Sequence, residues 1–262
     1  MDITFLGTCS GTEPMPGRRH TSFAVEAGGW VYFFDAGEGC SHTAHNLGLD
    51  LLRLRAVFIS HPHIDHIGGL PNLLWTVVKL GTRNSDPARA LGARTIDLCL
   101  PSEAIWDALQ AVARADRLRP DPFIPATPHY YADGPIYDDG VLRVQALHNT
   151  HLGHAAPDQP WHAFSFRIEA EGKALVYSGD IGHVSELEPL LDAADLVLME
   201  TGHHGVEATC RYFAARAERF GRIGFLHHGR EILDDPQGKL ALAQSLLGDR
   251  VFIADDGMRV TV

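Results

Sequence analysis

The stretch "FISHPHIDHIGGL" (Phe58–Leu70) places three imidazoles and one carboxylate within six consecutive positions, directly after an apolar run. The four side chains are those of His61, His63, Asp65 and His66. In an extended segment that follows a strand, the first two histidines alternate and project to one side. The aspartate and the third histidine can then turn towards a second point. This geometry favours two metal ions rather than one.

The residue types in this motif are those that bind zinc, manganese or iron(II). Imidazole nitrogens and carboxylate oxygens are ligands of these ions, and a hydrolytic site leaves one coordination position for water. The alternative is a polar loop with incidental histidines. The H-x-H-x-D-H spacing is far more specific than a pattern of single residues, so we interpret the motif as a metal site.

Length and composition indicate an ordinary globular protein. The chain has 262 residues, 45% of them apolar and 21% charged, and we expect one domain spanning residues 1–262. The N-terminus lacks a basic segment followed by a long apolar one, and no apolar run approaches the roughly 20 residues that cross a bilayer. We therefore expect a cytoplasmic protein that does not span the membrane.

Charge and cysteine content exclude several classes of function. The formal net charge is −11, so long-range capture of nucleic acid by a basic face is not expected, whereas small anionic substrates remain compatible with a metal site. The four cysteines are scattered without a C-x-x-C pair, which argues against a zinc ribbon or a dithiol redox site. Buried free thiols are the expectation.

Strand-like and helix-like segments alternate along the chain. Apolar runs end repeatedly in Gly, Asp or His, and amphipathic helical patterns separate them, which implies an α/β or layered αββα architecture. We expect one helix over residues 185–194 and another beginning at Gly68 or Gly69. Residues 81–97 and 120–135 resemble exposed loops.

The metal motif resembles the signature of the metallo-β-lactamase superfamily, in which H-x-H-x-D-H stands here as His61–His66. The segments Phe5–Glu26 and Phe34–Gly39 are similar to the opening of the branch that contains ribonuclease Z and cyclic phosphodiesterases, and Val251–Val262 also suits that branch. The resemblance extends over nearly the whole chain. It implies an α/β fold of four layers, the αββα sandwich, and a binuclear metal site.

Further ligands follow from the resemblance. The third-motif histidine follows a strand of the form V-x-A-x-x-x-x-H, which makes it His151, with His148 and His154 as weaker candidates. The bridging carboxylate falls in "YSGD" at Asp180, and without the upstream motif this residue would be interpreted as a turn aspartate that caps a helix.

The last ligand is implied to be a histidine that ends a late strand. The segment "GFLHHGRE" offers His227 and His228, of which strand alternation lets only one face the site, and the spacing favours His227. The first implied site is then His61, His63, His151 and Asp180. The second is Asp65, His66, Asp180 and His227.

Three other groups are implied to assist. Asp35 resembles a carboxylate that orients a ligand imidazole, and Asp65 is a candidate for orienting the attacking hydroxide. In phosphodiesterase relatives a Glu and a downstream His serve near the leaving group. The nearest matches are Glu200 with His203 or His204, but the spacer is shorter than in the family, so a structural pair is an equal alternative.

The resemblance implies a binuclear metal-dependent hydrolase with two divalent ions, zinc or manganese, iron being a further option. The favoured reaction is phosphodiester hydrolysis by a metal-bridging hydroxide on a small or single-stranded nucleotide substrate. A carbonyl hydrolase acting on a lactone, thioester or ester is the alternative. A non-hydrolytic di-iron redox or metabolite-binding protein ranks lowest, because that branch carries Glu at the position of His63 and needs a flavin domain.

The expected partner is a small anionic substrate, such as a nucleotide or short single-stranded RNA. Transfer RNA is not expected, because His151 and Asp180 are only 29 positions apart, which leaves no room for the arm that bacterial ribonuclease Z carries there. Arg18, Arg19 and Arg230 are candidate anion clamps. Relatives commonly form homodimers, for which tryptophans such as Trp75 would serve an interface unless they lie in the core.

Overall fold

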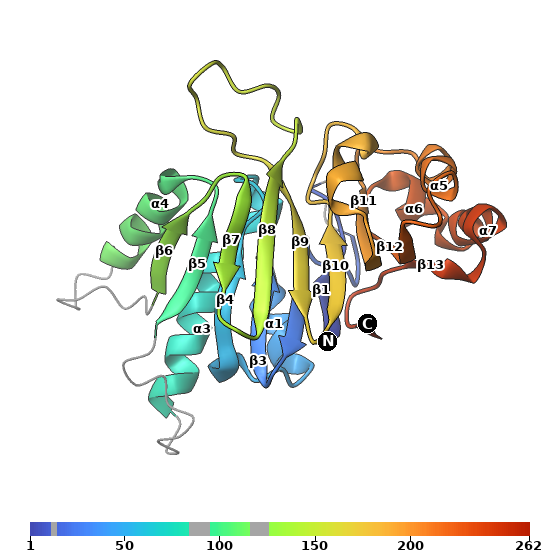
Figure 1. Cartoon of the computed structure of the whole chain (residues 1–262). Helices are drawn as coiled ribbons and strands as arrows, with labels where there is room; N and C mark the ends of the chain where they lie inside the picture. Colours follow the sequence, from blue (N-terminus) through green and yellow to red (C-terminus); the bar gives the residue numbers. More distant parts are fainter. Residues whose placement is uncertain (12–14, 84–94, 116–125) are drawn as a thin grey trace.

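Two β-sheets lie face to face, and helices cover the outer side of each sheet (Figure 1). This computed structural model describes residues 1–11, 15–83, 95–115 and 126–262. The four layers confirm the expected α/β, αββα fold class. The two sheets each contain seven strands of mixed direction.

The first sheet has the order β14-β1-β2-β3-β4-β5-β6, in which β3 to β6 run parallel and the remaining pairs are antiparallel. Its strands are β1 (Asp2–Gly7), β2 (Ser22–Ala27), β3 (Trp30–Phe34), β4 (Leu54–Phe58), β5 (Ile96–Leu100), β6 (Ala126–Tyr130) and β14 (Arg259–Thr261).

The second sheet has the order β13-β12-β11-β10-β9-β8-β7, in which β10 to β13 run parallel and β7 to β10 alternate in direction. Its strands are β7 (Gly134–Asp138), β8 (Leu142–His148), β9 (Phe164–Ala170), β10 (Lys173–Tyr177), β11 (Ala194–Thr201), β12 (Phe220–His228) and β13 (Val251–Ile253).

The helices divide between the two outer faces. Those on the first sheet are α1 (Cys40–Asn46), the 3₁₀ turn η1 (Leu51–Arg53), α3 (Leu70–Arg83) and α4 (Glu103–Arg114). Those on the second sheet are η2 (Val184–Leu190), α5 (Val206–Ala214), α6 (Arg230–Asp234) and α7 (Pro236–Leu247), while η3 (Gly248–Arg250) leads into β13. Within the described residues, no helix is long and apolar enough to cross a bilayer.

An aromatic core between the sheets supports the strands that lead to the polar motif. Phe34 stacks on Phe58 at a ring-centroid distance of 4.8 Å and on Phe23 at 5.2 Å. Phe23 in turn meets the edge of Tyr177 in the second sheet at 5.0 Å. Because Phe58 ends β4 and Tyr177 ends β10, this packing fixes the relative positions of the two strand ends that follow.

Local sequence signals account for most helix positions. In α4, Ser102 accepts a hydrogen bond from the backbone of the first turn, and Ile105, Leu109 and Ala113 are buried at helical spacing. The helix expected over residues 185–194 is the shorter 3₁₀ helix η2, which contains Pro189, a residue that cannot donate a backbone hydrogen bond, and ends at Leu190. Ala194 already begins β11.

One of the two predictions about irregular segments needs correction. Residues 120–135, expected as a loop, contain β6 and the start of β7. Both are edge strands, where Pro128 and Pro135 are tolerated. These two prolines made the segment resemble a loop. The loop expected at 81–97 falls mainly on residues 84–94, which lie outside the described part of the chain.

Candidate metal centre

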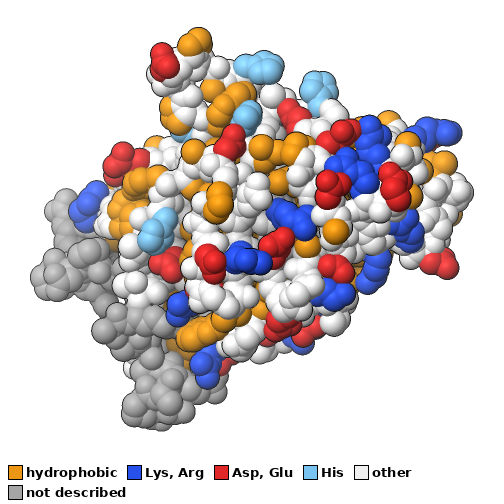
Figure 2. Space-filling model, viewed as in Figure 1, with side chains coloured by type: hydrophobic (Ala, Val, Ile, Leu, Met, Phe, Trp, Pro, Cys, Tyr) orange, Lys and Arg blue, Asp and Glu red, His pale blue; other side chains and the backbone are white. Residues whose placement is uncertain are grey.

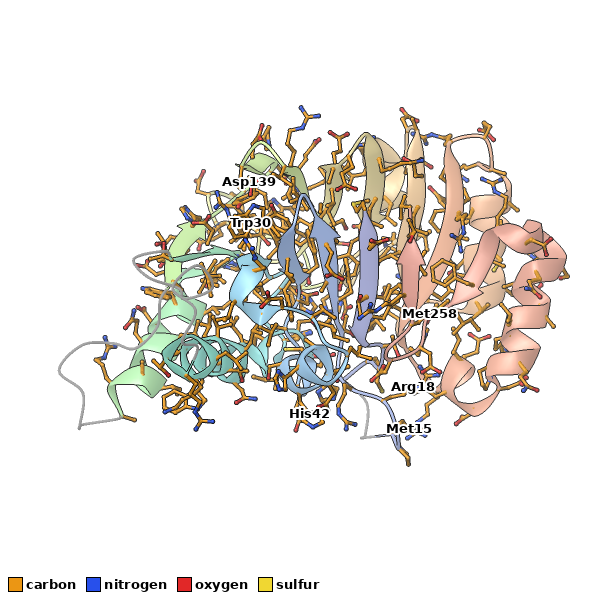
Figure 3. The ribbon with its side chains drawn as sticks, turned by 90° about the horizontal axis from the view of Figure 1, so that it is seen from below. Met15, Arg18, Trp30, His42, Asp139 and Met258 are labelled. Atoms are coloured by element: carbon orange, nitrogen blue, oxygen red, sulfur yellow. The ribbon has the colours of Figure 1, made fainter. Side chains whose placement is uncertain are left out.

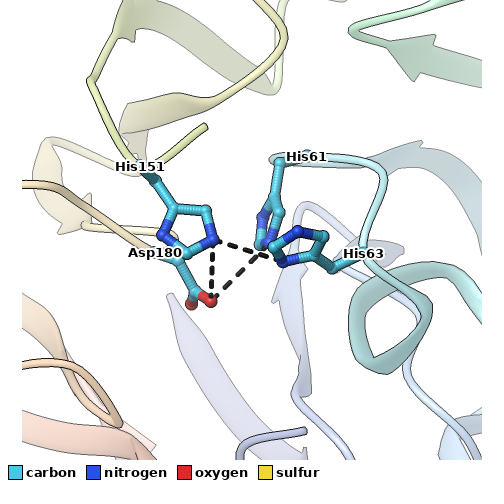
Figure 4. Close-up of side chains that lie close together, drawn as sticks. All are labelled: His61, His63, His151 and Asp180. Carbon is cyan, nitrogen blue, oxygen red and sulfur yellow. Dashed lines mark hydrogen bonds and ion pairs between the residues drawn. The ribbon is translucent and has the colours of Figure 1, made fainter. Parts of the chain in front are cut away.

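The first part of the centre follows the carboxyl ends of three strands. His61 and His63 come after β4, His151 after β8 and Asp180 after β10, and the four side chains converge (Figure 4). Asp180 Oδ2 lies 3.6 Å from His61 Nε2 and 3.7 Å from His151 Nε2. His63 Nδ1 lies 3.2 Å from His151 Nε2. One donor atom from each residue lies within 4.8 Å of the others, the spacing of ligands around a single ion.

The second part of the centre shares Asp180 with the first. Asp65 and His66 lie on the short helix α2 (Ile64–Ile67), and His227 lies near the end of β12. Asp180 Oδ1 lies 3.4 Å from His66 Nε2, and Asp180 Oδ2 lies 3.2 Å from His227 Nε2. Asp65 Oδ2 lies 3.6 Å from His66 Nε2. The helix expected from Gly68 or Gly69 begins at Leu70 as α3, and the sequence did not indicate the short helix α2 before it. This short helix brings the His66 ring within a centroid distance of 4.1 Å of the His61 ring.

Buried atoms without hydrogen-bond partners test whether metal ions fit here. Among the described residues, His61 Nε2, His66 Nε2 and Asp180 Oδ1 are buried polar atoms that make no hydrogen bond. Leaving such atoms unsatisfied costs about 1–3 kcal/mol each. Imidazole nitrogens and a carboxylate oxygen that face one another in this way are a donor set that suits divalent cations, so the residues fit the metals that the motif implies.

A buried carboxylate orients the imidazole of His66. Asp35 is fully buried, and its Oδ2 accepts hydrogen bonds from His66 Nδ1 at 2.7 Å, Ser60 Oγ at 2.8 Å and Tyr177 Oη at 2.6 Å. Its Oδ1 accepts from the Ser60 backbone at 2.7 Å. With Nδ1 donating to Asp35, the lone pair of His66 lies on Nε2 and faces the centre.

The same carboxylate acts on His61 through Ser60. The Ser60 hydroxyl lies 3.0 Å from His61 Nδ1 and donates its hydrogen to Asp35, so it accepts from His61 Nδ1. The lone pair of His61 is thereby placed on Nε2. Burial lowers the pKa of His61 well below its usual value, which favours the neutral, ligating form.

A bulge decides which of the two late histidines faces the centre. The β11–β12 register slips between Glu200 and Thr201, and His227 adopts a left-handed φ of +52°. His228 points elsewhere: its Nε2 bonds the Ala254 carbonyl at 2.8 Å, and its Nδ1 lies 3.2 Å from Thr201 Oγ1. Both ring nitrogens of His228 are engaged, so His227 is the one that reaches Asp180.

Neighbouring imidazoles stabilise the ionised form of the shared carboxylate. Burial raises the pKa of Asp180, but the neighbouring His227 and His66 outweigh this effect and hold it well below the usual range. Burial likewise lowers the pKa of His66, yet Asp180 and Asp35 raise it well above its ordinary value. A proton on His66 therefore offsets the charge of these carboxylates, and a cation bound at Nε2 would take the place of that proton.

Glu200 and His203 border the centre. Glu200 is fully buried at the end of β11, and its carboxylate accepts from the His203 backbone at 2.9 Å and lies 3.2 Å from His203 Nδ1. This hydrogen bond raises the pKa of His203, which lies 3.8 Å from Asp180. His204 bonds the Ile181 carbonyl through Nε2 at 3.0 Å.

The weaker ligand candidates lie on the connection between β8 and β9, residues 149–163, and at its base. This connection projects beyond the sheets (Figure 1), and Figure 2 shows histidine atoms over it at the upper edge. His148 stacks on Trp161 at 4.2 Å, and its Nδ1 lies 2.6 Å from Asp133. His154 is exposed, and the His/Asp groups of the described residues include neither histidine.

The arginine candidates are engaged by the protein. Arg18 lies on the β1–β2 connection beside Met258 in Figure 3. Its guanidinium bonds Thr8 Oγ1 at 2.8 Å and lies 3.3 Å from Asp255. Arg230 lies 3.8 Å from Asp234. Arg18 therefore ties the connection to the C-terminal segment rather than standing free for a substrate.

Comparison with known proteins gives this centre its family. A family model described as the β-lactamase superfamily domain matches residues 31–214. The chain belongs to the metallo-β-lactamase superfamily. It lies in the ribonuclease Z-like branch, since ribonuclease Z from Mycobacterium marinum is 28% identical over an alignment of 286 positions that covers 100% of this chain and 99% of the relative.

Solved structures of this superfamily share the fold. The short form of human tRNase Z has a TM-score of 0.73 at 21% identity, covering 100% of this chain and 99% of the other. The metallo-β-lactamase fold protein YhfI from Bacillus subtilis has a TM-score of 0.74 at 17% identity, covering 99% of each chain. The family and the His/Asp clusters make the chain a metal-dependent hydrolase of the ribonuclease Z and phosphodiesterase type.

Three residues that orient the candidate ligands were not predicted from the sequence. Ser60 directly precedes His61, and Tyr177 lies three positions before Asp180. Their closeness to these residues is a weak sequence signal for a supporting role. Thr21, whose hydroxyl lies 2.7 Å from His227 Nδ1, is 206 positions from its partner, and no pattern in the sequence connects the two.

Proposed function

We propose that the chain is a binuclear metal-dependent phosphodiesterase acting on a small or single-stranded nucleotide substrate. The observation that carries the proposal is the Asp180 carboxylate, whose oxygens lie 3.2–3.7 Å from imidazole nitrogens of both clusters. One ion is assigned to His61, His63, His151 and Asp180. The other is assigned to Asp65, His66, Asp180 and His227. Zinc or manganese suits these nitrogen and oxygen donors best, and iron is a further option.

The ligands come from both sheets, so the chain acts as one domain in this proposal. Divalent ions, when bound here, supply Lewis-acid stabilisation of the phosphoryl oxygens and lower the pKa of water. Among the chain's own groups, Asp65 is placed to accept a hydrogen bond from the attacking water. Its side chain is 13% exposed, whereas that of Asp180 is 2% exposed, so Asp65 is the carboxylate that solvent reaches more readily.

His203 is assigned as the acid that protonates the leaving oxygen. The buried Glu200 carboxylate binds Nδ1 and raises the pKa of His203, so the ring carries a proton near neutral pH more readily than a free imidazole does. Its side chain is 44% exposed, which leaves Nε2 open to a substrate. His204 is 17% exposed, and its bond to the Ile181 carbonyl suits a supporting role that holds the Glu200 loop.

Two exposed apolar side chains support a substrate with an organic group beside the phosphate. Ile64 is 72% exposed and follows His63, and Leu152 is 41% exposed and follows His151. The rings of His63 and His151 lie 4.9 Å apart, so the two exposed apolar residues each follow one of two neighbouring histidines of the first cluster. A nucleobase or another uncharged planar group would cover such surface on binding.

The size and charge of the surroundings favour small substrates over transfer RNA. Residues 149–163 form the connection at the position where the family places its transfer-RNA arm, and they include no Lys or Arg. With a net charge of −11, the chain lacks the electrostatic capture that large polyanions need. Relatives named ribonuclease Z support a nucleic-acid substrate class, and short single-stranded RNA or a free nucleotide is the member of that class proposed here.

The proposal is tested first by comparing activated substrates. Protein loaded with zinc or manganese is assayed on bis(p-nitrophenyl) phosphate and on an activated lactone, beside Asp65→Ala. We expect the wild-type protein to hydrolyse the phosphodiester and the Asp65→Ala protein to show no such turnover. Preference for the lactone would leave the metal centre in place and replace the proposal with its alternative, a carbonyl hydrolase, because the same donors would serve attack on a carbonyl carbon.

A second test isolates the acid. His203→Gln should lower turnover of a dinucleotide by about 10²–10⁴-fold, because its leaving alkoxide needs a proton. Turnover of bis(p-nitrophenyl) phosphate should change little, because p-nitrophenolate leaves without one. Equal losses on both substrates, or none on either, would remove His203 from the acid role. Metal content of the variant, measured in parallel, shows whether the centre itself is intact.

A further inference from the structure

We propose that Thr21 is a positioning residue whose hydroxyl fixes the tautomer and orientation of His227 and so sets the metal affinity of the second cluster. The inference rests on the proposed function only in requiring that Asp65, His66 and His227 bind a metal ion. Thr21 directly precedes β2, in the first sheet, and it is fully buried.

The hydrogen bonds around Thr21 determine where the proton of His227 lies. The Thr21 hydroxyl lies 3.1 Å from the Cys9 carbonyl and 2.7 Å from His227 Nδ1. A carbonyl oxygen only accepts, so the single hydroxyl hydrogen points to Cys9, and the oxygen accepts from His227 Nδ1. His227 therefore carries its hydrogen on Nδ1 and its lone pair on Nε2.

The lone pair on His227 Nε2 faces carboxylate oxygens, which can only accept hydrogen bonds. His227 Nε2 lies 3.2 Å from Asp180 Oδ2 and 4.0 Å from Asp65 Oδ2. In this tautomer the nitrogen cannot donate to either carboxylate. A cation between the three atoms turns that repulsion into coordination, so the tautomer that Thr21 selects is the one that binds metal.

Other features of His227 make this anchor necessary. Its backbone is in the left-handed region at φ +52°, which a non-glycine residue adopts at a cost. Gly202 leaves space beside the ring, since a Cβ at that position would lie 2.7 Å from Cδ2. The bulge delivers the side chain to the centre, and the hydrogen bond from Nδ1 then selects the ring orientation.

Thr21 acts separately from the anchors of the other buried imidazoles. The anchors of His61 and His66 both lead to Asp35, directly or through Ser60. Thr21 is a neutral residue outside that network. Removing its hydroxyl should therefore weaken the second cluster and leave His61, His63 and His151 unchanged.

The test uses three substitutions in the full chain. Thr21→Val removes the hydroxyl and keeps the shape, and Thr21→Ser restores the hydroxyl. Thr4→Val is the matched control, because Thr4 is also fully buried but its hydroxyl has no hydrogen-bond partner among the described residues. The measurement is the stoichiometry and affinity of Zn²⁺ binding to metal-free protein, by competition with a chromophoric chelator, with circular dichroism as the folding check.

We expect wild-type, Thr21→Ser and Thr4→Val proteins to bind two Zn²⁺ ions with the same affinities. Thr21→Val should bind one ion normally and the other about 10–100-fold more weakly, the loss typical of removing a group that orients a ligand. If the Thr21→Val protein does not fold, the Thr21→Ala protein is used instead, and we expect the same weaker binding of one ion.

Three results would overturn the inference. The first is wild-type affinity for both ions in Thr21→Val, the second is an equal loss at both ions in Thr21→Val, and the third is a loss in Thr21→Ser as large as that in Thr21→Val. The first result shows that the bond does nothing for binding, and the other two point to general packing. Failure of the wild-type protein to bind a second Zn²⁺ ion would instead remove the binuclear site itself, and with it the proposed function.

Discussion

Replacing Asp35 by Asn is the most demanding test of how the centre is built. The Asp35 carboxylate is fully buried and accepts four hydrogen bonds at 2.6–2.8 Å, one on Oδ1 and three on Oδ2. An amide of the same shape has only one accepting oxygen. If that oxygen takes the place of Oδ2, the new NH₂ group confronts the Ser60 backbone N–H, and the reverse orientation loses three bonds instead of one.

The magnitude follows from the better orientation. A buried N–H without a partner costs about 1–3 kcal/mol, and each bond to a charged acceptor that becomes neutral loses about 1 kcal/mol. Burying a neutral amide is easier than burying a carboxylate, which offsets part of this cost. We expect Asp35→Asn to lower the free energy of unfolding by about 3 kcal/mol, a large share of the roughly 5–15 kcal/mol of a typical domain.

Two assays separate stability from metal binding. Urea unfolding of metal-free protein, followed by tryptophan fluorescence, gives the change in stability, and Zn²⁺ competition gives an affinity loss of about 10–100-fold. Asp139→Asn is the control: Asp139 is 6% exposed and accepts from Tyr32 at 2.8 Å, but it precedes β8, whereas His151 follows the opposite end of that strand. The Asp139→Asn protein should be less stable than the wild type and should bind Zn²⁺ with the same affinity. Wild-type Zn²⁺ affinity in Asp35→Asn would refute the orienting role.

Two further predictions concern stability. Burial raises the pKa of Asp139, but hydrogen bonds from backbone N–H groups and Tyr32 outweigh burial and hold the pKa below the ordinary 3.8. The ionised Asp139 side chain therefore stabilises the folded state fully above pH 3.8, and this stabilisation is lost as the pH falls through the folded-state pKa. The difference in unfolding free energy between wild type and Asp139→Asn should be constant from about pH 7 to 5 and shrink below about 4 in urea titrations; a constant difference at every pH would contradict this. A Cβ on Gly37 would lie 2.5 Å from a backbone oxygen of Asp65, so Gly37→Ala should lower the unfolding free energy by about 1–3 kcal/mol. At Gly205 the nearest atom is 3.5 Å away, so Gly205→Ala should cost less than about 1 kcal/mol, and equal losses at both sites would refute the packing argument.

Local patterns in the sequence are enough to predict the layered α/β class and the motif at His61–His66. Alternating apolar runs and helical patterns require only local periodicity, and four ligand residues within six positions must lie near one another whatever the rest of the chain does. Asp180 and His151 came from family resemblance, because nothing local distinguishes a bridging aspartate from one that caps a turn.

The orientation of the candidate ligands depends on contacts between segments that lie far apart in the sequence. The choice of His227 over His228 depends on a bulge between β11 and β12, which strand alternation along one segment does not contain. The contact of Thr21 with His227 spans 206 positions and exists because the β1–β2 connection of one sheet meets the end of a strand in the other. Hydrogen bonds between distant segments follow from the packing of the two sheets, so neither residue carries a sign of its partner in its own neighbourhood.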